Sequence, residues 1–161
     1  MSNKIRAKSQ HPGFQLAYTT TGGPAIIEWK EVKTAAVKYG DSVVIDPNDG
    51  KVSIGLAASG TLYGVAAAGG AIGGKIPIWV GTETNVFMGR PNADATGIDI
   101  PLNCDIIGAT GAQLLNIGAD AKEVVRILGY VPTDDATDDT NHPRVFFTII
   151  RSSYDGRVAA K

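Results

Sequence analysis

The sequence predicts an all-β fold, either a small antiparallel β-barrel or a β-sandwich. The chain has 161 residues with 20 glycines and 8 prolines, so turn signals recur too often for long helices. Hydrophobic residues make up 43% of the chain, which is enough to build the core of one domain. We divide the chain into an N-terminal arm at 1–14, a β-barrel domain at 15–151 and a short C-terminal tail at 152–161, which we expect to be frayed.

The arm is basic and has no helical or strand pattern. Lys4, Arg6 and Lys8 alternate with small or apolar residues, and Phe14 follows a His-Pro-Gly turn. One interpretation is a disordered terminus. The other is an arm that becomes ordered on a neighbouring subunit, with Phe14 as its apolar anchor.

The first strands precede residue 33. Residues 15–21 alternate moderately, which predicts an edge strand, and residues 25–32 alternate strongly. Ile27, Trp29 and Glu31 then share one face of a partly exposed strand. We take the face of Trp29 and Glu31 as a second candidate for self-association.

The stretch from Tyr39 to Val80 organises the domain as short strands joined by glycine turns. The predicted strands are 38–46, 51–55, 60–67 and 75–80. Between the first two, a Pro-Asn-Asp-Gly sequence predicts a tight hairpin turn. The run from Gly69 to Lys75 superficially resembles a phosphate-binding loop, but the residue after the lysine is Ile76 rather than serine or threonine. A flexible turn between two strands is the favoured interpretation.

The second half of the chain predicts a further series of strands. Residues 86–89 form a short strand, 98–108 are strand or extended loop, and 112–117 are expected to pair with the next strand along the chain. Residues 122–131 are predicted to form a strand rather than a helix, because β-branched residues favour strands. With the strand at 144–151 they should form a hairpin across the loop between them. Both halves of the chain end in such a hairpin, but the sequence shows no clear internal repeat.

The loop of this last hairpin is acidic. Four carboxylates lie between Asp134 and Asp139. Hard cations such as Ca²⁺ prefer several oxygen ligands close together, so a Ca²⁺ site is one interpretation. The glycine and terminal glutamate of an EF-hand loop are missing, and this favours a solvated hairpin tip.

The sequence provides no group of residues that predicts catalysis. Cys104 is the single cysteine, and its apolar surroundings indicate a core residue. His11 and His142 lie in loop settings that would not fix an imidazole for acid–base chemistry. We therefore expect no enzyme activity, no cofactor and no metal centre.

The charge and hydropathy of the chain also limit its partners. The net charge of −1 gives no field that would attract nucleic acid or an anionic membrane. The basic N-terminus is not followed by the apolar segment of a signal peptide, and no apolar run approaches the ~18 residues of a membrane span. We expect a soluble protein that is made in a cytoplasm.

Several blocks of sequence resemble proteins of known kinds. Residues 39–46, 50–52 and 60–66 resemble the small β-barrel capsid decoration (cement) proteins of tailed bacteriophages, in which G-D-x-V and G-V-A strands recur. Residues 124–131 and 144–147 are similar to the end of capsid-associated proteins of phages. The resemblance spans roughly 38–150.

This resemblance implies a structural role without catalysis. Proteins of this kind bind the outer surface of an expanded icosahedral head and bridge neighbouring subunits of the major capsid protein. Many are trimers and others are dimers, and we expect a trimer in preference to a dimer, located on the virion. The expected contact residues are Lys4, Arg6, Lys8, Phe14, Trp29 and Glu31.

The alternative function is an all-β module that binds carbohydrate or another small ligand. Such a module needs exposed aromatic residues around one pocket. Trp29 and Trp79 lie far apart in the sequence and do not by themselves predict one.

Overall fold

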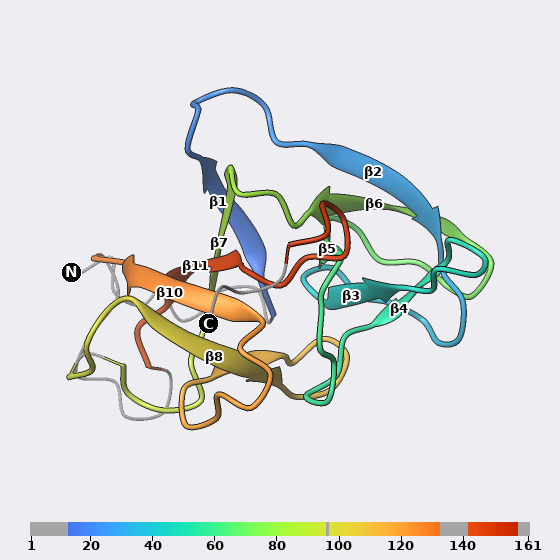
Figure 1. The fold of residues 1–161 in the computed structure, drawn as a ribbon. Coiled ribbons are helices and arrows are strands. Elements are labelled where there is room, and N and C mark those ends of the chain that lie inside the picture. Colours follow the sequence, from blue (N-terminus) through green and yellow to red (C-terminus); the bar gives the residue numbers. More distant parts are fainter. Residues whose placement is uncertain (1–12, 96, 133–141, 158–161) are drawn as a thin grey trace, which may run out of the picture.

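The computed structural model describes residues 13–95, 97–132 and 142–157. Within these ranges the chain forms eleven strands and no helix, which confirms the predicted all-β class (Figure 1). The strands are β1 Gln15–Thr19, β2 Ile27–Glu31, β3 Ser42–Ile45, β4 Val52–Ile54, β5 Gly64–Ala66, β6 Lys75–Val80, β7 Asn85–Gly89, β8 Leu102–Ile107, β9 Leu114–Asn116, β10 Val125–Tyr130 and β11 Val145–Ile149.

The strands form two antiparallel sheets that lie side by side in Figure 1. The five-stranded sheet has the order β2-β6-β5-β3-β4, and the six-stranded sheet has the order β1-β7-β11-β10-β8-β9. β1 lies at a sheet edge, as predicted, and β2 is an edge strand of the other sheet. The chain crosses from the first sheet to the second between β6 and β7.

Most predicted turns and pairings are confirmed. The β3–β4 hairpin turns at Gly50, whose φ is +69°, and Asp46 N–H donates to Lys51 O over 2.8 Å. β10 and β11 pair as the predicted hairpin, and residues 102–107 of the ambiguous segment form a strand. One pairing is wrong: β9 pairs with the preceding strand β8, because a six-residue connection lets the chain fold straight back.

Each sheet encloses its own cluster of buried side chains. Ile76, Ile78 and Val80 point to one face of the five-stranded sheet and pack on Val43 and Val52. The corresponding cluster of the six-stranded sheet includes Phe14, Phe87, Cys104, Leu115, Ile127, Val145, Phe147 and Ile149. Side chains on the opposite face of the first sheet, among them Val65 and Trp79, pack against this second cluster. The two sheets are therefore joined by apolar contacts.

Both sheets are curved strongly enough to bring together strands that lie far apart in the strand order. Val32, which follows β2, forms an isolated parallel bridge with Val52 of β4. Pro91, which follows β7, forms the same kind of bridge with Leu115 of β9. We call these two contacts the seams. Each seam is a single bridge rather than a ladder, so the sheets are strongly curved but are not closed barrels.

The two halves of the chain repeat one topology. Replacing β2, β6, β5, β3 and β4 by β7, β11, β10, β8 and β9 converts the order of the first sheet into that of the second. The seams correspond as well: Lys33 N–H donates to Val52 O over 2.8 Å, and Asn92 N–H donates to Leu115 O over 2.8 Å. The fold is thus an internal duplication of a five-stranded unit, and β1 is an additional strand on the edge of the second unit.

Buried polar side chains join the two units. The carboxylate of Asp41 is fully buried and accepts hydrogen bonds from Gly111 N–H over 2.7 Å and from the Thr110 hydroxyl. Gln113 accepts from Ser42 N–H and donates to Gly55 O, each over 2.6 Å. The β8–β9 connection of the second unit is therefore fixed on the first unit.

The segment that follows β11 also belongs to the folded domain as far as residue 157. Ser152 is buried, bridges to Leu62 and Arg157, and is followed by Tyr154, whose ring packs on Tyr63. The prediction of a frayed tail is therefore wrong for residues 152–157, because their backbone groups pair with the first unit.

Candidate interaction surface

The most conspicuous exposed apolar surface lies on strand β2. Ile26, Ile27 and Trp29 have 43%, 46% and 64% of their surface exposed. β2 pairs with β6 on one side only and forms the edge of its sheet (Figure 1). The sequence prediction of a partly exposed strand is confirmed, and we call residues 25–30 the β2 edge.

The backbone N–H and C=O groups of the β2 edge point alternately toward β6 and away from it. Ile26 O accepts a hydrogen bond from Val80 N–H over 3.2 Å, and Val32 N–H donates to Gly74 O over 2.9 Å. Because hydrogen-bonded positions alternate along an antiparallel strand, the even-numbered residues direct their amide groups to β6. Ile27 and Trp29 direct theirs to the outer side, where no described strand lies.

The side chains of Ile27 and Trp29 lie on the same face of the sheet as aromatic residues from elsewhere in the chain. Ile27 lies opposite Trp79, and Trp29 lies opposite Pro77, so the two tryptophans are diagonal neighbours on one face. Trp79 is half-buried and packs edge-on against Tyr39, with ring centroids 6.0 Å apart. The sequence alone does not predict this proximity of the tryptophans, since only the β2–β6 register brings them together.

The opposite face of β2 is polar, and its charges are already paired. Tyr63 Oη donates a hydrogen bond to Glu28 Oε2, and Lys30 Nζ lies 3.5 Å from the same oxygen. Burial, and then the hydrogen bond to Glu28, raise the pKa of the Tyr63 hydroxyl well above its usual range, so it remains a donor. Glu28 and Lys30 therefore form a local pair.

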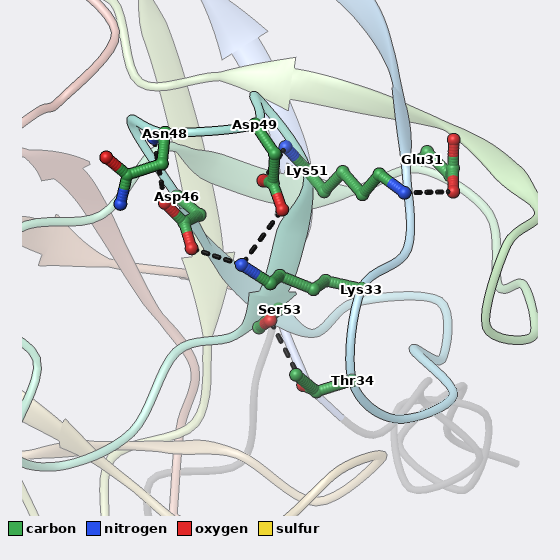
Figure 2. Close-up of polar contacts among 8 residues, drawn as sticks. All are labelled: Glu31, Lys33, Thr34, Asp46, Asn48, Asp49, Lys51 and Ser53. Carbon is green, nitrogen blue, oxygen red and sulfur yellow. Dashed lines mark hydrogen bonds and ion pairs between the residues drawn. The ribbon is translucent and has the colours of Figure 1, made fainter.

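Glu31, the other predicted contact residue on this strand, is engaged within the chain. Lys51 Nζ lies 2.8 Å from Glu31 Oε1, and this contact raises the pKa of Lys51 (Figure 2). The structure confirms that Glu31 shares a strand face with Trp29. Its carboxylate, however, belongs to the ion pairs of the first seam, whereas Trp29 is exposed.

The first seam is held by charged side chains that join the residues after β2 to the β3–β4 hairpin (Figure 2). Lys33 Nζ contacts Asp46 Oδ2 and lies 2.9 Å from Asp49 Oδ2, while Thr34 Oγ1 lies 3.1 Å from Ser53 Oγ. The hydrogen bonds from Lys33 lower the pKa of both aspartates, and those from the aspartates raise the pKa of Lys33. The seam thus closes the outer side of β2 beyond Glu31.

Phe14 does not serve as an external anchor. Its side chain is buried in the core of the second unit, where its ring packs edge-on against Phe147 with centroids 5.1 Å apart. Phe14 N–H also donates to Gly40 O over 2.8 Å. The prediction that Phe14 contacts a neighbouring subunit is therefore wrong, because Phe14 belongs to the folded domain. Lys4, Arg6 and Lys8 lie outside the described residues.

The other residues considered for chemistry have structural surroundings. Cys104 is fully buried in the second core, and burial raises the pKa of its thiol to about 12, with a smaller contribution from Asp105. Residues 69–74 lie in the connection between β5 and β6, as predicted, and Lys75 begins β6. His142 accepts a hydrogen bond from Arg90 Nη1 at its backbone oxygen over 2.9 Å. His11 and the loop from Asp134 to Asp139 lie outside the described residues.

The described part of the chain has neither a cluster of metal-ligating side chains nor a membrane-spanning helix. No group of three or more histidine, cysteine, aspartate or glutamate side chains there could hold a metal ion. No helix in the same ranges is long and apolar enough to cross a bilayer.

Comparison of the sequence with protein-family models and curated proteins, and of the fold with solved structures, finds no match.

Proposed function

We propose that this chain is a capsid decoration protein. It binds the outer surface of an icosahedral phage head, bridges neighbouring subunits of the major capsid protein and stabilises the mature shell without catalysis. A ligand that binds only the mature lattice stabilises it by mass action, so a modest interface suffices when it is repeated many times.

The observation that carries this proposal is the position of the sequence blocks that resemble decoration proteins. The G-D-x-V block at 40–43 leads into β3, which begins at Ser42, and the G-V-A block is β5. The two blocks are neighbours: Gly40 N–H donates to Ala66 O over 2.9 Å, and Ala66 N–H donates to Asp41 O over 2.8 Å. The resemblance therefore falls on adjacent strands at the centre of the first unit rather than on scattered turns.

The basic residues Lys4, Arg6 and Lys8 are the proposed contacts with the capsid. They precede a folded domain whose first described residues are fixed at Gly40. An extended segment that becomes ordered on a partner adds contact area at an entropic cost. The exposed β2 edge is the proposed site of contact between copies.

The decisive experiment is co-sedimentation of the purified protein with expanded capsids and with unexpanded precursors. We expect saturable binding to expanded capsids that weakens when residues 1–12 are deleted, with an unchanged melting temperature because Phe14 is kept. Deletion through residue 14 is the control for core damage and should lower the melting temperature. Full-length protein that does not bind expanded capsids would refute the proposal.

A second candidate function, binding of carbohydrate or another small ligand, is favoured by one observation. Trp29 and Trp79 lie on the same face of the first sheet, and aromatic faces of this kind can stack on ligands. Titration with oligosaccharides, followed by tryptophan fluorescence and compared with a Trp29→Ala variant, tests this function. A saturable change that Trp29→Ala abolishes, in a protein that does not bind capsids, would favour it.

A further inference from the structure

The duplication allows the β2 edge to be compared with its counterpart in the same chain. β2 corresponds to β7, so that Ile27 and Trp29 correspond to Val86 and Met88. On β7 the outer side is covered by β1, which pairs with Val86 through Tyr18 and with Met88 through Gln15. Val86 is only 1% exposed, whereas Ile27 is 46% exposed. Among the described residues, the first unit thus has no counterpart of the strand β1 that covers the second unit.

The seam defines how long a strand this vacant edge can accept. β1 covers Asn85 to Met88, the counterpart of residues 26–29, and stops before the seam at Pro91. On the first unit the seam at Val32 likewise blocks the edge beyond Glu31. The site therefore accepts about four to six residues in an extended conformation.

The β2 edge also lacks the features that keep sheet edges apart. Edge strands are usually protected by outward charges, proline or bulges. Here the register with β6 is regular, and the charges of Glu28 and Lys30 are paired with each other and with Tyr63 on the far face. The other face of the β2 edge, opposite to that of Glu28 and Lys30, has the side chains of Ala25, Ile27 and Trp29. A strand can therefore dock without burying an unpaired charge.

We propose that the β2 edge binds the β2 edge of a second copy of this chain, in antiparallel orientation about a two-fold axis at Ile27. The two five-stranded sheets then become one continuous sheet across the dimer. The proposal specifies the self-association expected of a decoration protein. Its test needs no capsids, so the two proposals can fail separately.

A second copy fits this site because antiparallel pairing is self-complementary. With the axis at Ile27, the outward amide groups of Ile27 face those of the partner's Ile27, as hydrogen-bonded positions require. Trp29 then lies opposite the partner's Ala25, and Glu28 lies opposite the partner's Ile26, so no like charges are directly opposite each other. The paired residues, 25–29, also stop before Glu31 and therefore do not overlap the first seam. Two-fold pairing gives a dimer rather than the trimer expected from the resemblance.

The test is the mass of the purified protein in solution as a function of concentration. We expect about twice the chain mass of 16.8 kDa, with a blue shift of tryptophan emission as the dimer forms. Trp29→Lys and Ile27→Lys should each raise the dimer dissociation constant at least about 100-fold, since buried aromatic and central residues dominate interfaces. Leu56→Lys is the matched control, because Leu56 is 58% exposed but lies away from β2, and it should leave the mass unchanged.

Covalent linkage tests the register. In a Cys104→Ser background, Ile27→Cys should be linked into dimers by a short bismaleimide, and Leu56→Cys should not. Thermal unfolding of each variant establishes that its fold is intact. The proposal would be overturned if the protein were a monomer at all concentrations. It would also be overturned by a dimer that neither lysine variant weakens, or by a trimer that Ile27→Cys does not link. A monomer whose capsid binding is lost in Trp29→Lys would assign the edge to the capsid protein instead.

Discussion

Asp41 shows how one buried side chain can connect two structural units. Its carboxylate accepts hydrogen bonds from Lys38 N–H over 2.9 Å and, across the unit boundary, from Gly111 N–H and the Thr110 hydroxyl. An ionised carboxylate is an acceptor only, so it suits three donors converging in a buried site. The residue that belongs to the G-D-x-V block is therefore a structural residue in this fold.

Replacing Asp41 should cost much of the stability of the protein. Asp41→Ala leaves three partly buried donors without this acceptor, and we expect a loss of about 3 kcal/mol in the free energy of unfolding, measured in urea. Asp41→Asn keeps the shape but points amide hydrogens at some of these donors, so it should also destabilise. The exposed Asp120→Ala is the control. A change below about 0.5 kcal/mol for Asp41→Ala would contradict this role.

Cys104 should be unreactive in the folded protein. Only the thiolate is nucleophilic, and burial raises the pKa of this thiol to about 12. At pH 8 we expect iodoacetamide to modify the native protein at least about a thousandfold more slowly than the urea-unfolded protein, followed by mass spectrometry. Rapid labelling under native conditions would show that the second core opens easily.

At the scale of elements, the sequence predicted strands well and their partners less well. Alternation and glycine turns located β2, β3, β6 and the β10–β11 hairpin, because these signals are local. The pairing of β9 was wrong because periodicity does not state on which side a short strand finds its neighbour. The seams were not predicted, since Val32 and Val52 are ordinary core residues in sequence and meet only through the curvature of the sheet.

The candidate site was also predicted only in part, because the sequence shows local alternation but not which residues meet across strands. Trp29 could be found from the alternation of residues 25–32, and it is exposed at a sheet edge. Phe14 was misplaced because it precedes any recognisable strand, although an aromatic residue directly before β1 is a signal for the core. The paired surroundings of Glu31 depend on Lys51, which the hairpin turn brings across the seam.

The first seam should make stability depend on acidic pH. Lys33 lowers the pKa of Asp46 and Asp49 below the ordinary value of 3.8, so the folded state holds these protons less tightly than the unfolded state. Their contribution is present above pH 3.8 and is lost as the pH falls through the lowered folded values. We therefore expect Lys33→Met to lose less stability than the wild type between about pH 5 and pH 2.5, measured by thermal unfolding.

The control for this comparison is Lys122→Met, which removes an exposed lysine just before β10 in the second unit, outside the first seam. It should retain the wild-type dependence on pH. Parallel pH profiles for Lys33→Met and the wild type would show that the Lys33 contacts do not contribute to the stability of the seam.

At the scale of the whole molecule, the duplication is evident in topology and almost absent from the sequence. Corresponding positions share burial rather than identity: Ile76, Ile78 and Val80 match Val145, Phe147 and Ile149. Any apolar residue can occupy such positions, so the sequence retains only a general pattern. The connections also differ, since residues 67–74 between β5 and β6 correspond to a longer acidic connection between β10 and β11.

A duplicated fold could unfold as two units or as one, and the contacts between the units favour one. Gln113 holds Ser42 and Gly55, Leu62 N–H donates to Arg151 O over 3.0 Å, and Val65 packs on the second core. Neither sheet therefore has a complete core or complete hydrogen bonding without the other. We expect a single cooperative transition, as is usual for a domain of this size.

The chain contains a natural probe for each unit. Both tryptophans, Trp29 and Trp79, lie in the first unit, and the single cysteine, Cys104, lies in the second. Tryptophan fluorescence and Cys104 alkylation should give the same urea midpoint. Gln113→Ala, which removes two buried hydrogen bonds across the units, should lower both midpoints together, by about 2 kcal/mol in unfolding free energy. If Cys104 became reactive at a lower urea concentration than the fluorescence change, the second unit would unfold first, and the cross-unit contacts would not be sufficient to make the duplicated fold one cooperative domain.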